Sequence, residues 1–303
     1  MQIVRYRTPG GPVQVGVLQD GSVTAVPGVQ TLAELWQLSV ADLRAAVTGL
    51  RPDTGIPHEA VEVLAPVDAR TEVWACGVTY EISREARVED AEAAADVYDL
   101  VYDAVRPELF FKSVAWRVAG PGRTIGVRAD STVDVPEPEL ALVLNRHGET
   151  VGYTACNDVS SRSIEGENPL YLPQAKVYSG SCALGPGITP AWEVADPYDL
   201  GIGLRIDRDG DTVFDGTAST SSLHRRFDDL VEHLFRGDVH PDGAVLSTGT
   251  CLVPPPPFSL QDGDVVTVEI AGVATLVNPV VRGLVPDPDP AAAHADPVLE
   301  GTS

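Results

Sequence analysis

Two glutamates one residue apart open the most constraining stretch of the chain, VPEPELALVLNRHGETVGYTACND at 135–158. Successive side chains of a β-strand point to opposite faces, so Glu137 and Glu139 are expected to project from the same face. Two like charges held this close repel each other unless a cation or a shared proton lies between them. The apolar run at 140–144 argues against a solvent-exposed acidic strand edge.

A polar break at 145–150 separates this run from a second β-rich run that ends at Asp158. A turn at 147–149, with His147 exposed to solvent, would return the second strand antiparallel and bring Asp158 beside the two glutamates. Three carboxylates on neighbouring strands suit a hard divalent cation such as Mg²⁺ or Mn²⁺, with water or substrate as the other ligands. The sequence therefore predicts a metal site formed by Glu137, Glu139 and Asp158.

This stretch resembles the metal-site core of the fumarylacetoacetate hydrolase superfamily. Its spacing from Glu139 to Asp158 is similar to that of the sugar-acid dehydratase branch, which contains the 2-keto-3-deoxy-D-arabinonate dehydratases. Other motifs of the superfamily occur in the same order along most of the chain: CGVTY at 76–80, PELFFK at 107–112, AKVYSGSCALGP at 175–186, LSTGT at 246–250 and QDGDVVTVEIAGVATLVNPV at 261–280.

The resemblance implies a hydro-lyase of oxidative pentose catabolism, which converts a 2-keto-3-deoxy pentonate into 2,5-dioxopentanoate. A 2-oxo acid chelates Mg²⁺ through its carboxylate and keto oxygens. The ion then acts as a Lewis acid and stabilises the enolate formed when a C3 proton leaves. Loss of the C4 hydroxyl as water and tautomerisation complete the reaction. Relatives are generally dimers or larger, so we expect a cytoplasmic homodimer or homotetramer.

Carbon–carbon bond hydrolases of this superfamily carry a histidine and a glutamate in a pattern similar to N-Y-x-x-H-x-x-E. This chain continues from Thr79 and Tyr80 with Ser83 and Ala86 at those two positions. Without that pair no group is in place to activate an attacking water, which favours the dehydratase. An acylpyruvate hydrolase, an oxaloacetate decarboxylase and a non-catalytic metal- or ligand-binding protein are the alternatives.

Only two of the 21 basic residues are lysines, Lys112 and Lys176, and both lie in the motifs above. Lysine provides a compact charge that is readily lost when the amine is desolvated or lies beside a cation. Lys176 is therefore the first candidate for the base that removes the C3 proton, and Glu108 is the candidate acid/base partner. Lys112 is expected to balance the carboxylate charge or to hold ligands in place.

The remaining candidates concern the substrate. The resemblance implies that Thr250 contacts the substrate carboxylate and that Gly249 lets the backbone approach closely. Glu167 is a further candidate for the lining of the pocket around the sugar hydroxyls. The residues predicted to bind substrate are Lys112, Thr250, Gly249, Arg162, Tyr178 and Tyr80.

Composition limits the class of protein. A net charge of −23 argues against binding to nucleic acid or to anionic membranes, which requires clustered lysine and arginine. No apolar run reaches the roughly 18 residues of a membrane span, and the first residues do not resemble a signal peptide. Four widely spaced cysteines indicate buried free thiols.

The pattern of apolar residues predicts an α+β protein in two domains. Residues 1–65 are expected to form a small α+β domain, with short strands over 1–30 and a helix over 31–50 that begins after Thr31 and ends near Gly49. Residues 66–285 are expected to form a β-dominated catalytic domain, a rolled mixed sheet with one clear later helix at 221–237. Acidic helices over 81–104 are a candidate lid, and 286–303 is expected to be a disordered tail.

Overall fold

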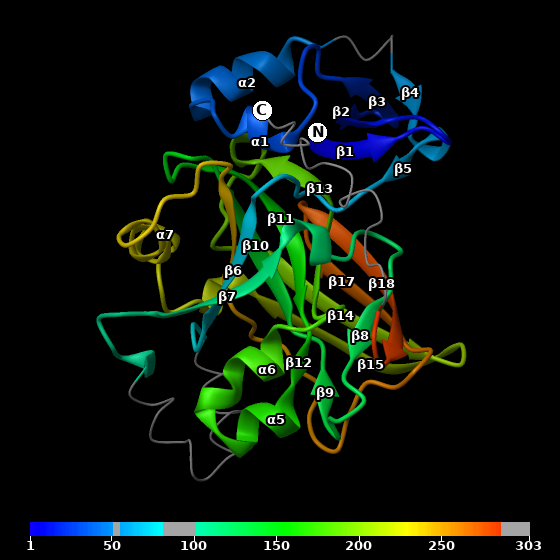
Figure 1. Ribbon diagram of the computed structural model, residues 1–303, viewed down its shortest axis with the longest axis vertical. Coiled ribbons are helices and arrows are strands. Elements are labelled where there is room, and N and C mark those ends of the chain that lie inside the picture. Colours follow the sequence, from blue (N-terminus) through cyan, green and yellow to red (C-terminus); the bar gives the residue numbers. More distant parts are fainter. Residues whose placement is uncertain (51–54, 81–100, 286–303) are drawn as a thin grey trace, which may run out of the picture.

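The computed structural model describes residues 1–50, 55–80 and 101–285, and it has the β-dominated α+β fold that the sequence predicts (Figure 1). Except for 101–104, the helices and lid expected over 81–104 lie outside these residues, as does the tail expected over 286–303. Within the described part of the chain, no helix is long and apolar enough to cross a membrane.

The N-terminal residues form a β-meander, as the alternating pattern predicts. One of its turns contains Asp20 and Gly21, both at positive φ. Strand β1 (Gln2–Arg7) also pairs antiparallel with β13 (Cys182–Pro190), so the meander continues the main sheet, while the domain division at residue 65 stays a prediction. The other strands of this part are β2 (Val13–Gln19), β3 (Ser22–Ala25), β4 (Ile56–Pro57) and β5 (Glu62–Val63).

The prediction of one continuous helix over 31–50 was wrong, because the segment forms two helices. Ser39 interrupts it: its side chain accepts a hydrogen bond from the backbone N–H three residues later and so starts a second helix. The N-cap at Thr31 and the end at Gly49 are confirmed. The two helices are α1 (Leu32–Leu35) and α2 (Val40–Thr48).

The main sheet places the acidic stretch near its centre. Strand β10 (Pro138–Leu144) pairs antiparallel with β11 (Thr150–Asp158) on one side and with β16 (Ala244–Ser247) on the other. Strand β6 (Glu72–Gly77) is parallel to β16 and antiparallel to β7 (Glu108–Val114). The order across the sheet is β4-β3-β2-β1-β13-β11-β10-β16-β6-β7, with β5 paired to β1.

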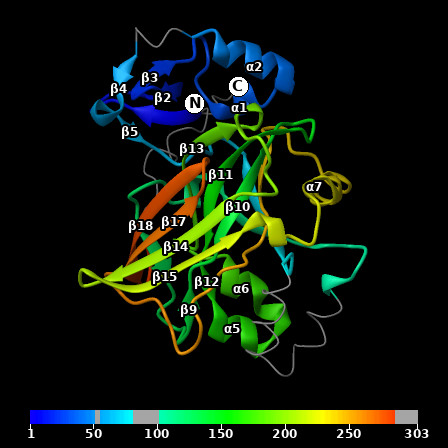
Figure 2. The ribbon, with the colours of Figure 1, turned by 180° about the vertical axis from the view of Figure 1, so that it is seen from behind.

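A second sheet, in the order β15-β14-β17-β18-β8, packs against the first, and the core lies between them (Figure 2). Leu142 of β10 belongs to this core, whereas its neighbour Val143 packs in a second cluster that includes Leu32 and Leu43 of the N-terminal helices. Both faces of β10 are therefore buried, which explains its continuous apolar run. The strands of the second sheet are β8 (Ile125–Val127), β14 (Gly201–Arg208), β15 (Asp211–Ser219), β17 (Val265–Ile270) and β18 (Ala274–Arg282).

The prediction of only one later helix was wrong. The helix expected over 221–237 is α7 (Phe227–Phe235), which starts later than expected and follows a 3-10 turn at 220–222. Two short helices next to the acidic stretch had no counterpart in the predictions, since five or six residues are too few to show an amphipathic period. They are α5 (Arg162–Glu167) and α6 (Leu172–Lys176), near the two-stranded ribbon of β9 (Asp134–Val135) and β12 (Ser160–Ser161).

All four cysteines are free and buried, as predicted.

Candidate metal centre and active site

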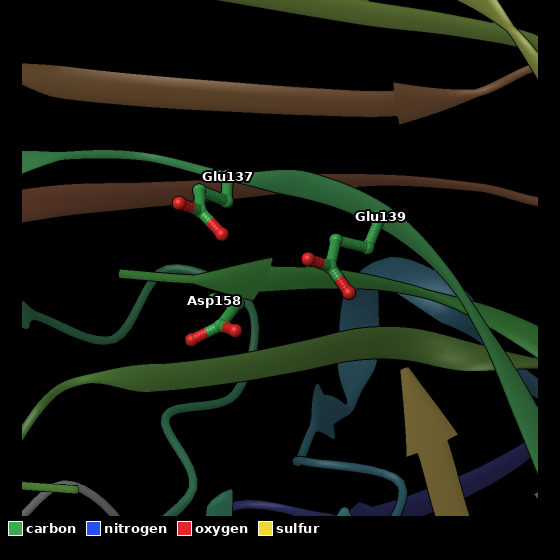
Figure 3. Close-up of side chains that lie close together, drawn as sticks. All are labelled: Glu137, Glu139 and Asp158. Carbon is green, nitrogen blue, oxygen red and sulfur yellow. The ribbon is translucent and has the colours of Figure 1, made fainter. Parts of the chain in front are cut away.

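Three carboxylates converge at the end of β10 and β11, as the sequence predicts. The antiparallel pairing places Glu139 opposite Cys156, and the backbone N–H of Asp158 donates to the carbonyl of Glu137 over 2.9 Å. One carboxylate oxygen from each of Glu137, Glu139 and Asp158 lies within 4.8 Å of the others (Figure 3). His147 is an exposed residue of the connecting turn, which confirms its predicted place.

Two of the carboxylates are paired with buried cations. Glu137 accepts a 2.8 Å hydrogen bond from Arg162 on Oε1 and a 2.7 Å hydrogen bond from Lys176 on Oε2. The Nζ atom of Lys112 lies 2.5 Å from Oδ1 of Asp158, and that of Lys176 lies 3.3 Å from Oδ2. Three positive side chains from β7, α5 and α6 thus face three negative ones, and all six are buried.

Glu139 is held by neutral donors. Its Oε2 atom accepts hydrogen bonds from the hydroxyl of Ser247, at 2.5 Å, and from the backbone N–H of Gly249, at 2.8 Å. Burial, followed by repulsion from Asp158 and Glu137, raises the pKa of Glu139 to about 8. Without a metal this carboxyl therefore keeps a proton at neutral pH.

This arrangement fits a divalent cation. Carboxylate oxygens are the donors that Mg²⁺ prefers. Burial and repulsion from Asp158 and Glu137 favour the protonated form of Glu139, and a cation among the three oxygens would offset that repulsion and displace the proton. Glu137, Glu139 and Asp158 are thus the residues that would hold the metal.

Both lysines are fully buried at this site. Lys112 donates to the carbonyls of Val159, at 3.2 Å, and Lys176, at 2.5 Å, in addition to its ion pair with Asp158. These contacts agree with the charge-balancing role expected for Lys112. Lys176 lies at the end of α6; its Nζ donates to the hydroxyl of Ser160 and lies 5.8 Å from the ring centroid of Phe110.

The structure places the predicted substrate residues around the same carboxylates, with several polar groups already engaged. Thr250 is buried and donates to the carbonyl of Pro138 over 3.0 Å. Gly249 has a φ of +91°, and its N–H is the donor to Glu139 described above. Arg162 points to Glu137. Their contacts with substrate stay predictions.

Four further candidates are Tyr80, Tyr178, Glu108 and Glu167. Tyr80 is fully buried, and burial raises the pKa of its phenol. Burial also raises the pKa of Tyr178, whose ring lies 5.7 Å from the guanidinium carbon of Arg128. Glu108 starts β7 and lies against the backbone of Gly77, where a methyl group would come within 2.0 Å of its carboxylate. Glu167 is exposed.

Several residues of the site were missing from the sequence predictions. Ser160 and Ser247 bond directly to Lys176 and Glu139, and Asn157 accepts the backbone N–H of Glu137 over 3.2 Å. A signal existed for two of them, because Ser160 follows Asp158 by two positions and Ser247 lies in the LSTGT motif. The sequence alone does not say which of four polar or small residues in that motif faces Glu139.

Residues 74–281 match the family described as "Fumarylacetoacetate (FAA) hydrolase C-terminal". The chain is 47% identical over 264 residues to a "Probable 2-keto-3-deoxyxylonate dehydratase" of Haloferax volcanii, covering 86% of this chain and 89% of the relative. It is 44% identical over 225 residues to a "2-dehydro-3-deoxy-D-arabinonate dehydratase" of Saccharolobus solfataricus, covering 73% and 75%.

Among solved structures, the fold is similar to that of a 2-keto-3-deoxy-D-arabinonate dehydratase complexed with magnesium and 2,5-dioxopentanoate. The TM-score is 0.81 and the sequence identity 34%, covering 94% of this chain and all of that one. The similarity thus extends over both the N-terminal meander and the acidic site.

Proposed function

The chain belongs to the fumarylacetoacetate hydrolase family, and we propose that it is a metal-dependent dehydratase of a 2-keto-3-deoxy pentonate that forms 2,5-dioxopentanoate. The observation that carries this proposal is the position of Lys176. Its amine donates hydrogen bonds to Glu137 and Asp158, two of the three clustered carboxylates, and is buried. A base fixed beside a cation site is what proton removal next to a keto group requires.

The bound ion would supply a Lewis acid that polarises the 2-keto group and so acidifies the C3 proton. Lys176 takes the C3 proton, and its amine is held in place by the hydroxyl of Ser160 and by Glu137. Glu108 donates a proton to the departing C4 hydroxyl, which leaves as water, and tautomerisation gives the product. Burial of the charged side chains keeps competing water away from them.

Support for a dehydratase over the alternatives comes from the base. Ser83 and Ala86 replace the histidine and glutamate that would activate a water in the hydrolases, although both positions lie outside the described residues. Lys176 removes a proton without needing such a water. A superfamily hydrolase or an oxaloacetate decarboxylase therefore ranks second, and a non-catalytic binding protein third.

The test is a product assay on protein stripped of metal with EDTA. Racemic 2-keto-3-deoxy pentonate, acetylpyruvate and oxaloacetate are each incubated with and without Mg²⁺, with Glu139→Gln as the inactive control. Formation of 2,5-dioxopentanoate that depends on Mg²⁺, with little turnover of the other two acids, is the expected result. Turnover of acetylpyruvate or oxaloacetate instead would contradict the proposal, and so would full activity of the control.

We further propose that the enzyme acts in oxidative pentose catabolism, that it is cytoplasmic and that it forms a homodimer or homotetramer. Light scattering on a sizing column tests the assembly, and a single species at the mass of one 32.1 kDa chain would contradict it.

A further inference from the structure

One peptide unit links the loop after β6 to the metal site. The hydroxyl of Thr79 donates a 2.6 Å hydrogen bond to the carbonyl of Thr248. The N–H of the same peptide unit, on Gly249, donates a 2.8 Å hydrogen bond to Oε2 of Glu139. Hydrogen bonds in such a chain polarise one another, so the hydroxyl strengthens the donor that reaches the carboxylate.

The backbone around Thr79 holds the residue in one position. Val78, just before it, has a φ of +53°, which is unusual for a β-branched residue and persists only where its surroundings enforce it. Val78 is buried against Val101 and Tyr102, and the carbonyl of Thr79 accepts a 2.9 Å hydrogen bond from the backbone N–H of His224. Thr79 is itself fully buried. The loop therefore presents its hydroxyl in one orientation.

The receiving peptide is fixed in the same way. Thr248 donates to the carbonyl of Leu140 from its N–H, at 3.0 Å, and from its hydroxyl, at 2.8 Å. Gly249 has a φ of +91°, and a methyl group there would lie 2.1 Å from the hydroxyl oxygen of Thr79. Only glycine leaves room for this contact, which places Thr79 directly against the turn that holds Glu139.

We propose that Thr79 is a positioning residue for the metal ligand Glu139. Gly249 and Ser247 together occupy the two lone-pair directions of Oε2, which leaves Oε1 as the oxygen presented to the cation. Thr79 fixes one of these two donors through the peptide unit. The inference rests on the metal site of the proposed function and extends it to a residue that touches neither metal nor substrate.

The test compares Thr79→Val, which removes the hydroxyl at nearly constant shape, with Thr79→Ser, which keeps it. Binding of Mg²⁺ and Mn²⁺ is measured by calorimetry, and Mn²⁺ binding also by electron paramagnetic resonance. Loss of a direct hydrogen-bond partner of a metal ligand weakens metal binding by about 10- to 100-fold. Thr79 acts on such a partner through one peptide unit, so we expect a loss at the lower end, about tenfold, for valine and a change within about threefold for serine. Near-UV circular dichroism of the metal-free proteins reports whether the fold is intact.

Wild-type affinity in a folded valine variant would overturn the inference, and equal weakening by valine and serine would do the same. If the valine variant does not fold, Thr79→Ala replaces it under the same criteria. Wild-type protein that binds neither ion would overturn the inference together with the metal site. Wild-type protein that binds metal without dehydrating the pentonate overturns only the proposed reaction, since the affinities of the variants still decide the role of Thr79.

Discussion

Lys176 donates a 2.7 Å hydrogen bond to Oε2 of Glu137, and its Nζ atom also lies 3.3 Å from Oδ2 of Asp158. The amine thus occupies the same two carboxylates that would bind the metal. A divalent cation on those oxygens favours the neutral form of the amine, because two positive charges that close repel. Metal binding and formation of the base are therefore coupled through shared ligands.

Replacing Lys176 by methionine will abolish dehydration without weakening the metal site. Removal of a positioned base lowers kcat by about 100-fold or more. The affinity for Mg²⁺ is expected to be equal or higher, because the competing positive charge is gone. Lys176→Arg is the matched control, since it keeps a charge but cannot act as a base at neutral pH. The assay is formation of 2,5-dioxopentanoate, with calorimetry for Mg²⁺; a methionine variant that keeps most of its kcat would exclude Lys176 as the base.

The carboxylate of Glu108 can be displaced by a substitution at another residue, Gly77. A methyl group on Gly77 would come within 2.0 Å of the Glu108 carboxylate, whereas the backbone of Gly77 already has an ordinary strand conformation. Gly77→Ala is therefore expected to move a flexible side-chain end and leave the strand intact. Its kcat should fall by about 100-fold, as in Glu108→Gln, because both changes remove the acid.

The melting temperature and the Mg²⁺ affinity should stay near the wild-type values in both variants, since Glu108 is not among the three clustered carboxylates. A normal kcat in Gly77→Ala, combined with a low kcat in Glu108→Gln, would show that the carboxylate works from another position. Normal rates in both would remove Glu108 from the mechanism.

The convergence of Glu137, Glu139 and Asp158 could be predicted because it depends on local rules. Strand alternation places the two glutamates on one face, and a tight turn fixes the antiparallel return of Asp158. The meander and most later strands followed from similar patterns. The places where helices begin and end depended on single side chains. Ser39 divides the N-terminal helical segment because its side chain caps the N-terminus of the second helix.

The partners of the carboxylates could not be predicted, because they come from distant elements. The rarity of lysine pointed to Lys112 and Lys176, yet which carboxylate each one meets depends on how β7 and α6 pack. The hydrogen bond from Arg162 to Glu137 was also not predicted, since Arg162 begins a short helix with no sequence signal. The hydrogen bond from Thr79 to Thr248 depends on the positive φ of Val78, which no pattern in the sequence predicts.

Lys112 is expected to be a stabilising residue in the metal-free protein. Lys112→Met removes one of the two buried cations beside Asp158 and leaves Lys176, 3.3 Å from Oδ2, as its remaining partner. Loss of a partner that leaves a buried charge wholly unpaired lowers the free energy of unfolding by about 3–5 kcal/mol, so we expect a loss below that range while Lys176 still contacts Asp158. Urea denaturation of EDTA-treated protein measures this change. Saturating Mg²⁺ should recover part of it, since the ion restores positive charge at Asp158; an unchanged midpoint without metal would contradict the expected role.

The pKa of Glu139, about 8, contributes to the pH dependence of the stability of the metal-free protein. In the folded chain this carboxyl stays protonated up to that pH, whereas in the unfolded chain it ionises near its ordinary value of 4.5. Between these values the folded state binds more protons, so its stability falls as pH rises from about 4.5 to about 8. Glu139→Gln, which has no proton to lose, should show a shallower slope in urea titrations, and the raised pKa values of Asp68 and Asp134 account for what remains.

The same proton governs binding of the metal. Below pH 8 an arriving ion must displace the proton of Glu139, so the affinity for Mg²⁺ is expected to rise about tenfold per pH unit and to level off above pH 8. Calorimetry at several pH values, in two buffers of different ionisation enthalpy, gives both the affinity and the number of protons released. Glu139→Gln should bind Mg²⁺ weakly and without this release. Equal wild-type affinity at pH 6 and pH 8 would mean that Glu139 is already ionised when the metal arrives, and that its cationic neighbours outweigh its burial.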